Sequence, residues 1–213
     1  MACLKSLSIT NVVAACCFLS IWAGNVDAGK YNTTIDIGDK APQWKDLPGT
    51  DGESHSLSDL KDAPAVIVVF TCNSCPYAID AEERLIKLAE SLAPQGIKVV
   101  AINVNKVEED RMPAMKARAA EKKYPFTYLF DESQQIAKQF GAKYTPEFFL
   151  LDRERRIAYM GSLDDSPDGS EVTKSYLKDA IDALMNGQSV QVAETVPIGC
   201  RIRIERERRR RSR

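Results

Sequence analysis

The stretch AVIVVFTCNSCP, residues 65–76, places two cysteines between an apolar strand and the start of a helix. Its first six residues are apolar without alternation, a pattern typical of a central strand that is covered on both faces of a sheet. Pro76 is suited to the first turn of a helix, because the N–H that proline lacks would have no partner there. The sequence therefore predicts a buried strand at residues 65–70, two thiols at its carboxyl end and a helix directly after them.

Cys72 and Cys75 form a C-x-x-C pair whose position indicates thiol chemistry. We expect Cys72 at or just before the helix N-terminus, where free backbone N–H groups and the positive end of the helix dipole stabilise a thiolate. Cys72 would then attack a disulfide as the thiolate, and Cys75 would resolve the mixed disulfide by pairing with Cys72. Asn73, Ser74 and Pro76 are expected to tune this thiolate. A strand, C-x-x-C and a helix in this order are a more specific signal than C-x-x-C alone.

Hydrophobic periodicity outside this stretch predicts further strands and helices. Apolar side chains three or four residues apart form one face of a helix over residues 81–92, with Glu82 on the solvated face. A turn-rich segment at residues 35–60 predicts a short hairpin with Trp44 and Leu57 in the core. The other predicted elements are strands at residues 98–104, 148–151 and 156–160 and helices at residues 112–123, 133–140 and 176–184. This order predicts an α/β fold with a mixed central β-sheet flanked by helices.

Tyr144-Thr145-Pro146 stands just before one of the predicted strands. Together with the strand, the C-x-x-C pair and the helix, it resembles the thioredoxin superfamily. The resemblance implies a thioredoxin-like fold in which Pro146 is cis and lies beside the cysteines, and in which the backbone of Thr145 pairs with the substrate. Residues 37–44 and 56–60 are similar to the opening of the redoxin, or AhpC/TSA, branch, which includes peroxiredoxins and exported bacterial thioredoxin-family proteins.

Three positions depart from thioredoxin itself. Thr71 stands where thioredoxin has a tryptophan, Asn73-Ser74 replaces its Gly-Pro dipeptide, and Val66 occupies the place of its buried acid. The motif therefore does not predict a reduction potential. Proton transfer during exchange must use another group or water.

The first 28 residues have the features of a signal peptide. Lys5 precedes an apolar run at residues 12–23, and Val26-Asp27-Ala28 supplies the small side chains that a signal peptidase needs. A lipoprotein signal at Cys16 is less favoured, because the apolar run continues past it. We therefore expect export, either to the periplasm or by secretion. The predicted organisation is a signal peptide (residues 1–28), a thioredoxin-like redoxin domain (residues 35–187) and a C-terminal extension with an Arg-rich tail (residues 188–213).

The composition of the 213 residues, 44% apolar and 28% charged, excludes a wholly disordered chain and a multi-span membrane protein. The formal net charge of −1 hides two unlike parts. Residues 199–213 hold eight arginines and two glutamates, a charge of +6, so the rest of the chain carries −7. An arginine run is usually a solvated tail, and without interleaved aromatic residues it makes a weak case for membrane contact. Nucleic acid is not an expected partner.

The sequence thus predicts an exported thiol-disulfide oxidoreductase. Its expected partners are dithiols and disulfides of other proteins, together with an upstream thiol reductase or oxidase. No cofactor and no metal are expected, because the cysteines themselves carry the electrons. Removal of the signal peptide would leave three of the six cysteines, Cys72, Cys75 and Cys200.

Three other interpretations fit the same residues. A peroxiredoxin-like peroxidase would use Cys75 as its peroxidatic cysteine and Cys200 to resolve it, although Cys72 replaces the family's Thr or Ser three residues earlier. A zinc site would need all three cysteines and the isolated His55. A non-catalytic binding module would keep Cys72–Cys75 as a structural disulfide. Cys200 itself is either a third redox cysteine, within the site or between molecules, or an unreactive and partly buried thiol.

Overall fold

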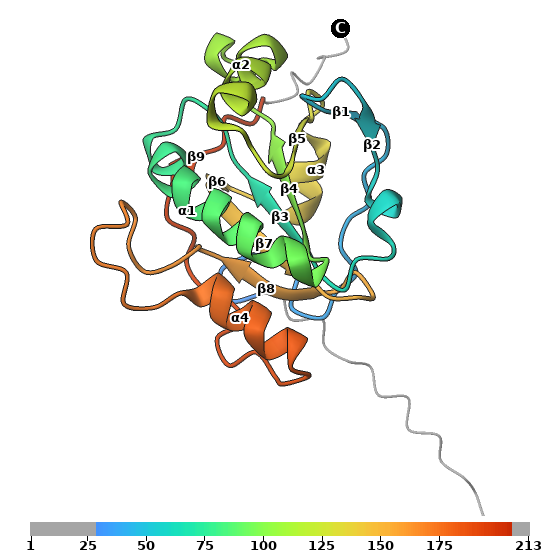
Figure 1. Cartoon of the computed structure of the whole chain (residues 1–213), viewed down its shortest axis with the longest axis vertical. Coiled ribbons are helices and arrows are strands. Elements are labelled where there is room, and N and C mark those ends of the chain that lie inside the picture. The colour runs from blue at the N-terminus through green and yellow to red at the C-terminus, as the bar shows by residue number, and fades with distance from the viewer. Residues whose placement is uncertain (1–28, 206–213) are drawn as a thin grey trace, which may run out of the picture.

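The computed structural model describes residues 29–205, so the predicted signal peptide and residues 206–213 lie outside the described part of the chain. Its centre is a five-stranded sheet in the order β5-β4-β3-β7-β8 (Figure 1). The strands are Val66–Phe70 (β3), Lys98–Asn103 (β4), Thr127–Phe130 (β5), Glu147–Leu151 (β7) and Ile157–Gly161 (β8). Strands β3, β4 and β5 are parallel, whereas β7 runs antiparallel to both β3 and β8. The predicted mixed sheet is therefore confirmed.

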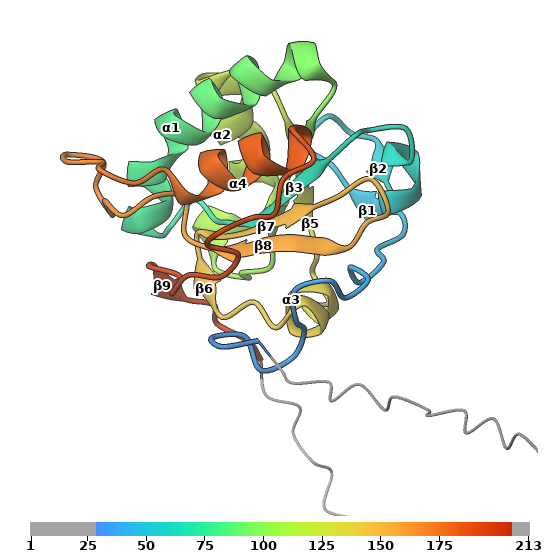
Figure 2. The ribbon, with the colours of Figure 1, turned by 90° about the horizontal axis from the view of Figure 1, so that it is seen from below.

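Helices cover both faces of this sheet, as Figure 2 shows. Three helices lie on one face: α1 (Pro76–Leu92), α2 (Met112–Lys122) and α4 (Tyr176–Met185). On the other face lie α3 (Gln135–Phe140) and the N-terminal segment. The predicted arrangement of a sheet flanked by helices is confirmed. Within residues 29–205, no helix is long and apolar enough to cross a membrane.

Strand β3 forms the centre of the core. Each of its five residues is fully buried, because β4 and β7 flank it and helices cover both faces. On the α3 face, the rings of Phe70, Phe140 and Phe149 pack edge to face with centroids 5.1 to 5.7 Å apart. This packing fixes the carboxyl end of β3, where the cysteine loop begins.

The turn-rich opening forms the expected hairpin. Strands β1 (Leu47–Pro48) and β2 (Ser54–His55) pair antiparallel, and a 3-10 helix at Leu57–Leu60 follows them. Trp44 and Leu57 are both buried in the core, as predicted. Two further 3-10 helices lie at Ala93–Gln95 and Glu108–Asp110.

Two features differ from the sequence-based expectation. Strand β5 was not predicted, because four residues behind a proline-containing turn make too short a pattern. Glu82 was expected on a solvated helix face, yet it is only 7% exposed. The reason is that α2 packs beside α1 and brings Arg118, whose Nε donates to Glu82 at 2.8 Å, while the Tyr124 hydroxyl donates to the same carboxylate. The hydrophobic pattern of α1 alone does not show that a second helix packs beside it.

The chain after α4 runs back across the domain instead of leaving it. Strand β9 (Cys200–Arg201) pairs antiparallel with β6 (Tyr144–Thr145), and the side chain of Ile202 is buried in the same core layer as α3. Gln134 Nε2 donates to the carbonyl oxygen of Arg203 at 2.9 Å. The described part of the predicted C-terminal extension therefore packs against the domain.

Candidate active site

The two cysteines lie at the carboxyl end of β3, in the loop that leads into α1. Helix α1 begins at Pro76, and its N-cap residue is Cys75, which has an extended backbone. Sequence reasoning placed Cys72 at or just before the helix start, so the structure corrects this point: the thiol at the cap is that of Cys75. The helix begins after Cys72 and not at it, because the backbone N–H groups of Asn73 and Ser74 donate to the side chain of Asp110 and keep both residues in the loop.

Thr145 and Pro146 form the opposite wall of the site. The Thr145–Pro146 peptide bond is cis, as the family resemblance implied. Cys75 Sγ lies 2.9 Å from the carbonyl oxygen of Thr145, and Cys72 Sγ lies 3.6 Å from Thr145 Oγ1. Cys72 and Cys75 are only 5% and 2% exposed. The structure therefore brings together the four residues that the sequence singled out for catalysis and substrate binding.

The cysteine pair loses its first proton easily and holds its second one tightly. A hydrogen bond from Cys72 lowers the pKa of Cys75 to about 4, with further donation from the Cys200 thiol and the Ala78 backbone N–H. The same hydrogen bond, burial and the charge of Asp110 raise the pKa of Cys72. The thiolate is therefore favoured at Cys75, where the N-terminus of α1 also stabilises negative charge. This reverses the order expected from the sequence.

Asp110 holds the cysteine loop in place, and sequence reasoning missed it. Its Oδ1 accepts the backbone N–H groups of Asn73 and Ser74 at 2.8 and 2.9 Å, and its Oδ2 accepts the Ser74 hydroxyl at 2.6 Å. The side chain is fully buried. A signal was available, because the acidic run Glu108–Asp110 follows β4, and the carboxyl ends of parallel strands meet at one edge of a sheet. Asn73 and Ser74 thus act by anchoring the loop.

Glu147 shapes the turn on the other side of the site. Its Oε2 accepts the backbone N–H groups of Lys143 and Tyr144 at 2.7 and 2.9 Å, which folds the chain just before Thr145. Burial raises the pKa of Glu147 to about 7. No sequence pattern singled out this residue, because a glutamate at the start of a strand is ordinary.

Cys200 joins the pair, whereas His55 does not. Cys200 on β9 lies opposite Thr145 in the strand register and packs against Cys72, Cys75 and Ala78. His55 instead lies on β2, where its Nε2 is 2.8 Å from a carboxylate oxygen of Asp51. Among residues 29–205, no group of three or more His, Cys, Asp or Glu side chains is arranged to hold a metal ion. The structure therefore does not assemble the zinc site that needed His55.

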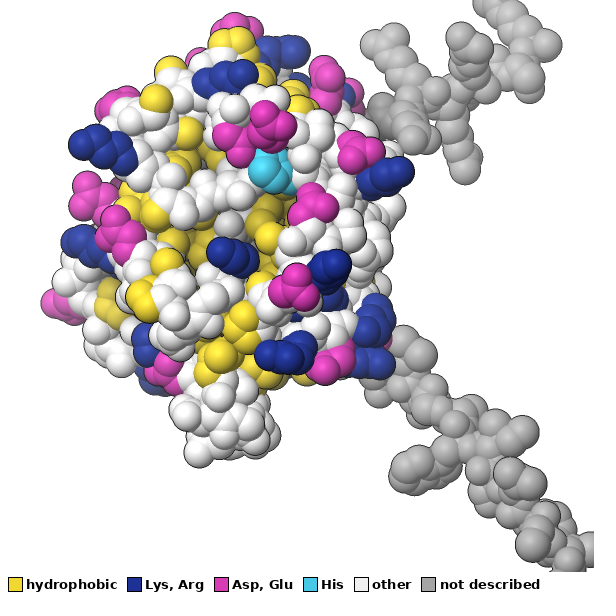
Figure 3. Space-filling model, turned by 45° about the vertical axis from the view of Figure 1, so that its right-hand side comes forward, with side chains coloured by type: hydrophobic (Ala, Val, Ile, Leu, Met, Phe, Trp, Pro, Cys, Tyr) yellow, Lys and Arg dark blue, Asp and Glu magenta, His cyan; other side chains and the backbone are white. Residues whose placement is uncertain are grey.

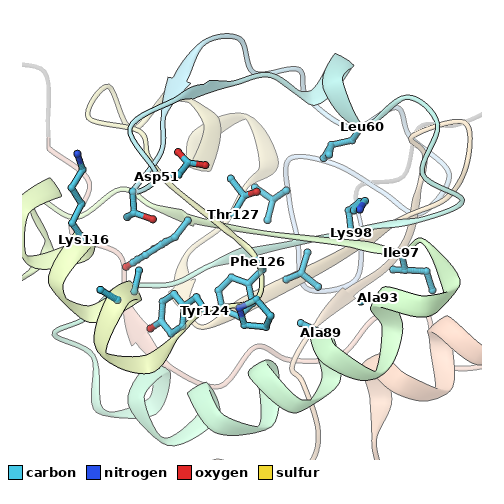
Figure 4. A pocket seen from close by; sticks show the side chains of 17 residues that line it. Asp51, Leu60, Ala89, Ala93, Ile97, Lys98, Lys116, Tyr124, Phe126 and Thr127 are labelled. Carbon is cyan, nitrogen blue, oxygen red and sulfur yellow. The ribbon is translucent and has the colours of Figure 1, made fainter.

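One large pocket lies away from the cysteines. It has a volume of about 620 Å³ and lies between α1, α2, β4 and β5, lined by Ala89, Lys116 and Phe126 among others (Figure 4). The space-filling view of this side of the molecule shows hydrophobic side chains exposed in a hollow (Figure 3). By contrast, the crevices on either side of Pro146, one of them lined by Cys72, hold only about 20 Å³ each. The crevices beside the cysteines are therefore far smaller than the pocket between α1 and α2.

Comparison with known proteins agrees with this geometry. The family model described as AhpC/TSA matches residues 37–160, more than half of the chain. The chain belongs to the AhpC/TSA family. Among curated proteins, it is 26% identical over 158 residues to peroxiredoxin Bcp of Escherichia coli (strain K12), an alignment that covers 68% of this chain and 97% of the relative.

Solved structures place the AhpC/TSA domain in the thioredoxin-like fold. A hypothetical protein from Sinorhizobium meliloti 1021 is 40% identical with a TM-score of 0.75, covering 80% of this chain and 96% of that one. A thioredoxin-family thiol:disulfide interchange protein from Chlorobium tepidum TLS has a TM-score of 0.55 at 17% identity, covering 70% and 97%. The second likeness supports the fold alone, which confirms the expected thioredoxin-like architecture.

The lowered pKa of Cys75 predicts a specific pH dependence for the reduced AhpC/TSA protein. Between its folded value of about 4 and the ordinary value of 9.0, the unfolded chain binds a proton that the folded chain does not. The free energy of unfolding should therefore rise with pH across this window. The part of it that Cys75 contributes should be lost as pH falls through about 4. Urea unfolding of the reduced wild type and Cys75→Ser at several pH values measures the difference. Equal slopes for both proteins would contradict the assignment.

The charge of Asp110 should control Cys72. In a Cys75→Ser background, Asp110→Asn keeps the side-chain shape but removes the charge, so the pKa of Cys72, read from the pH dependence of alkylation, should fall. Asp110→Ala also removes the carboxylate that accepts the N–H groups of Asn73 and Ser74, and the loss of these hydrogen bonds should cost about 2 kcal/mol in unfolding free energy. Glu108→Gln is the matched control, because its side chain is 89% exposed on the same turn. If it shifts the alkylation profile as much as Asp110→Asn does, the assignment is wrong.

Proposed function

We propose that this AhpC/TSA-family protein is a thiol-disulfide oxidoreductase that exchanges a Cys72–Cys75 disulfide with cysteines of partner proteins. The observation that carries the proposal is the pair of adjacent thiols at the start of α1, both in contact with Thr145. A lowered thiol pKa beside a second thiol is what disulfide exchange requires.

The reaction moves two electrons and two protons. In the reducing direction, a thiolate of this chain attacks one sulfur of the partner disulfide, and the other partner sulfur leaves and takes a proton. A second thiol of this chain then attacks the mixed disulfide, releases the partner as a dithiol and leaves Cys72 and Cys75 joined. In the oxidising direction the same steps run backwards. The low pKa of Cys75 makes it a good leaving group in the oxidising direction.

A second candidate, thiol peroxidase, has its own support. The curated relative is named a peroxiredoxin, and Cys75 has the lowered pKa that a peroxidatic cysteine needs. Cys75 thiolate would attack a peroxide, release the alcohol or water and become a sulfenic acid. Cys200, which packs against the C-x-x-C pair, would then condense with it, release water and form a Cys75–Cys200 disulfide. Cys72 occupies the place of the hydroxyl residue expected three positions earlier, which favours disulfide exchange as the main activity.

An insulin reduction assay with dithiothreitol tests the main proposal. Cys75→Ser should reduce turnover to the uncatalysed background, and Cys72→Ser should lower it, because exchange uses the Cys72–Cys75 pair. Ser189→Ala, an exposed loop change, is the control and should retain the wild-type rate. If Cys72→Ser leaves peroxide consumption intact while Cys75→Ser removes it, the peroxidase candidate is preferred. If alkylation shows no thiol change across a redox titration, the role is structural or that of a binding module.

We also propose that the protein is exported, on the basis of the signal features in residues 1–28. Cleavage after Ala28 would leave Gly29 as the first residue of the mature chain. Expression of the full chain in a bacterial host, followed by fractionation and N-terminal sequencing, tests this. Gly29 at the N-terminus of protein outside the cytoplasm is the expected result. Uncleaved protein that stays in the cytoplasm would contradict it.

A further inference from the structure

The strand edge beside the cysteines, that of β6, is already paired with the protein's own C-terminal segment. In the β6–β9 pairing, Thr145 lies opposite Cys200 and Tyr144 opposite Arg201, and the Ile202 N–H donates to the Lys143 carbonyl at 2.9 Å. A free strand edge is where an extended partner peptide would add its own backbone hydrogen bonds. Here that edge is filled from within the chain, beside the start of α1 in Figures 1 and 2.

Gly199 allows β9 to approach the site closely. A Cβ at this position would lie 2.2 Å from the carbonyl oxygen of Thr145 and 3.1 Å from the backbone nitrogen of Pro146. Only glycine therefore fits without displacing the strand. The carbonyl that Gly199 approaches is also the one in contact with Cys75 Sγ, so this approach places the next residue, Cys200, beside Cys75.

The segment around Cys200 is held on both sides. Before it, the Ser162 hydroxyl donates to the Val196 carbonyl at 2.7 Å. After it, Ile202 is buried in the core and Gln134 Oε1 accepts the Glu205 N–H at 2.8 Å. Cys200 is therefore a fixed neighbour of the C-x-x-C pair and does not hang from a loose tail.

Exposure separates the three thiols. Cys72 and Cys75 are almost fully buried, whereas Cys200 is partly exposed and packs against them. Cys200 is thus the sulfur of this cluster that another protein can approach while the fold stays intact. Tyr77 and Ile198, 40% and 38% exposed, line the crevice beside Pro146 and offer an apolar surface near this thiol.

We infer that Cys200 is the exchange cysteine of this protein: it meets partner thiols and passes disulfides to and from the buried pair through a Cys75–Cys200 bond. The inference rests on the proposed thiol-disulfide exchange and identifies where a partner enters it. The C-terminal strand then acts as a built-in substrate, seated permanently on the edge that a partner peptide would otherwise use.

The steps balance without any further oxidant. With Cys72 and Cys75 joined, the Cys200 thiolate attacks Cys75 Sγ, the Cys75–Cys200 bond forms, and Cys72 leaves and takes the proton that Cys200 lost. A partner thiolate then attacks Cys200 Sγ, forms a mixed disulfide and releases Cys75 as a thiolate. The second partner thiol attacks its own chain's sulfur in that mixed disulfide and releases Cys200. The partner ends as a disulfide and this chain as three thiols.

Disulfide mapping of the full chain tests the first step. After equilibration with oxidised glutathione, Cys72→Ser should contain an intramolecular Cys75–Cys200 bond, and Cys200→Ser should contain Cys72–Cys75, both read by mass spectrometry of non-reduced peptides. Gly199→Ala should lose Cys75–Cys200 in the Cys72→Ser background and keep Cys72–Cys75 in the otherwise wild-type chain. A Cys72→Ser chain with Cys75 joined only to glutathione, or Cys200 joined only to a second chain, would overturn the inference.

Exchange kinetics test the second step. A reduced peptide with two cysteines should reduce the oxidised Cys200→Ser chain about tenfold more slowly than wild type, because only buried sulfurs remain to be attacked. Arg201→Ser is the matched control, since it changes an exposed side chain on the same strand and leaves all three thiols. Equal rates for wild type and Cys200→Ser would overturn the inference and leave the proposed function standing. Failure of Cys200→Ser to form Cys72–Cys75 at all would contradict the proposed function itself.

Discussion

Thr145 is the residue on which all three cysteines converge, and the architecture of the site depends on this convergence. Its carbonyl oxygen lies beside Cys75, its hydroxyl lies beside Cys72, and its backbone pairs with Cys200. Strand register explains the first two contacts: Phe70 of β3 is paired with Glu147 of β7, so the residues after β3 lie beside those before β7. The third contact is added by a strand outside the main sheet.

The charges and hydrogen bonds around Cys72 and Cys75 shift the pKa values of the two thiols in opposite directions. Cys75 lies at the N-terminus of α1 and receives hydrogen bonds, whereas Cys72 lies near the buried carboxylate of Asp110. That carboxylate has a structural reason to be there, because it accepts two backbone N–H groups of the cysteine loop. The Asp110 side chain therefore holds the loop in place and, through its charge, disfavours the thiolate form of Cys72.

The features that were predictable from the sequence are those set by neighbouring residues. The apolar run of β3, the C-x-x-C pair and the helix after it lie within one short stretch, and the sheet with its flanking helices followed from periodicity. Asp110, Glu147 and the pairing of Cys200 were missed because they act on residues distant in sequence, and an acid in a loop or a two-residue strand has no local pattern. The sequence points to Cys72 as the thiolate, whereas the structure favours Cys75. The difference arises because Asp110 holds Asn73 and Ser74 outside α1, and nothing in the sequence connects Asp110 to that loop.

The origin of Cys200, 125 residues after Cys75, also sets the order in which the site is completed during protein synthesis. Chains emerge from the ribosome from the N-terminus, and domains fold as their residues become available. The C-x-x-C pair and the edge of Thr145 are made well before β9, so the nascent domain presents that edge uncovered. The covered, three-thiol form belongs only to the finished polypeptide, and a chain ending before Gly199 would keep the uncovered form permanently.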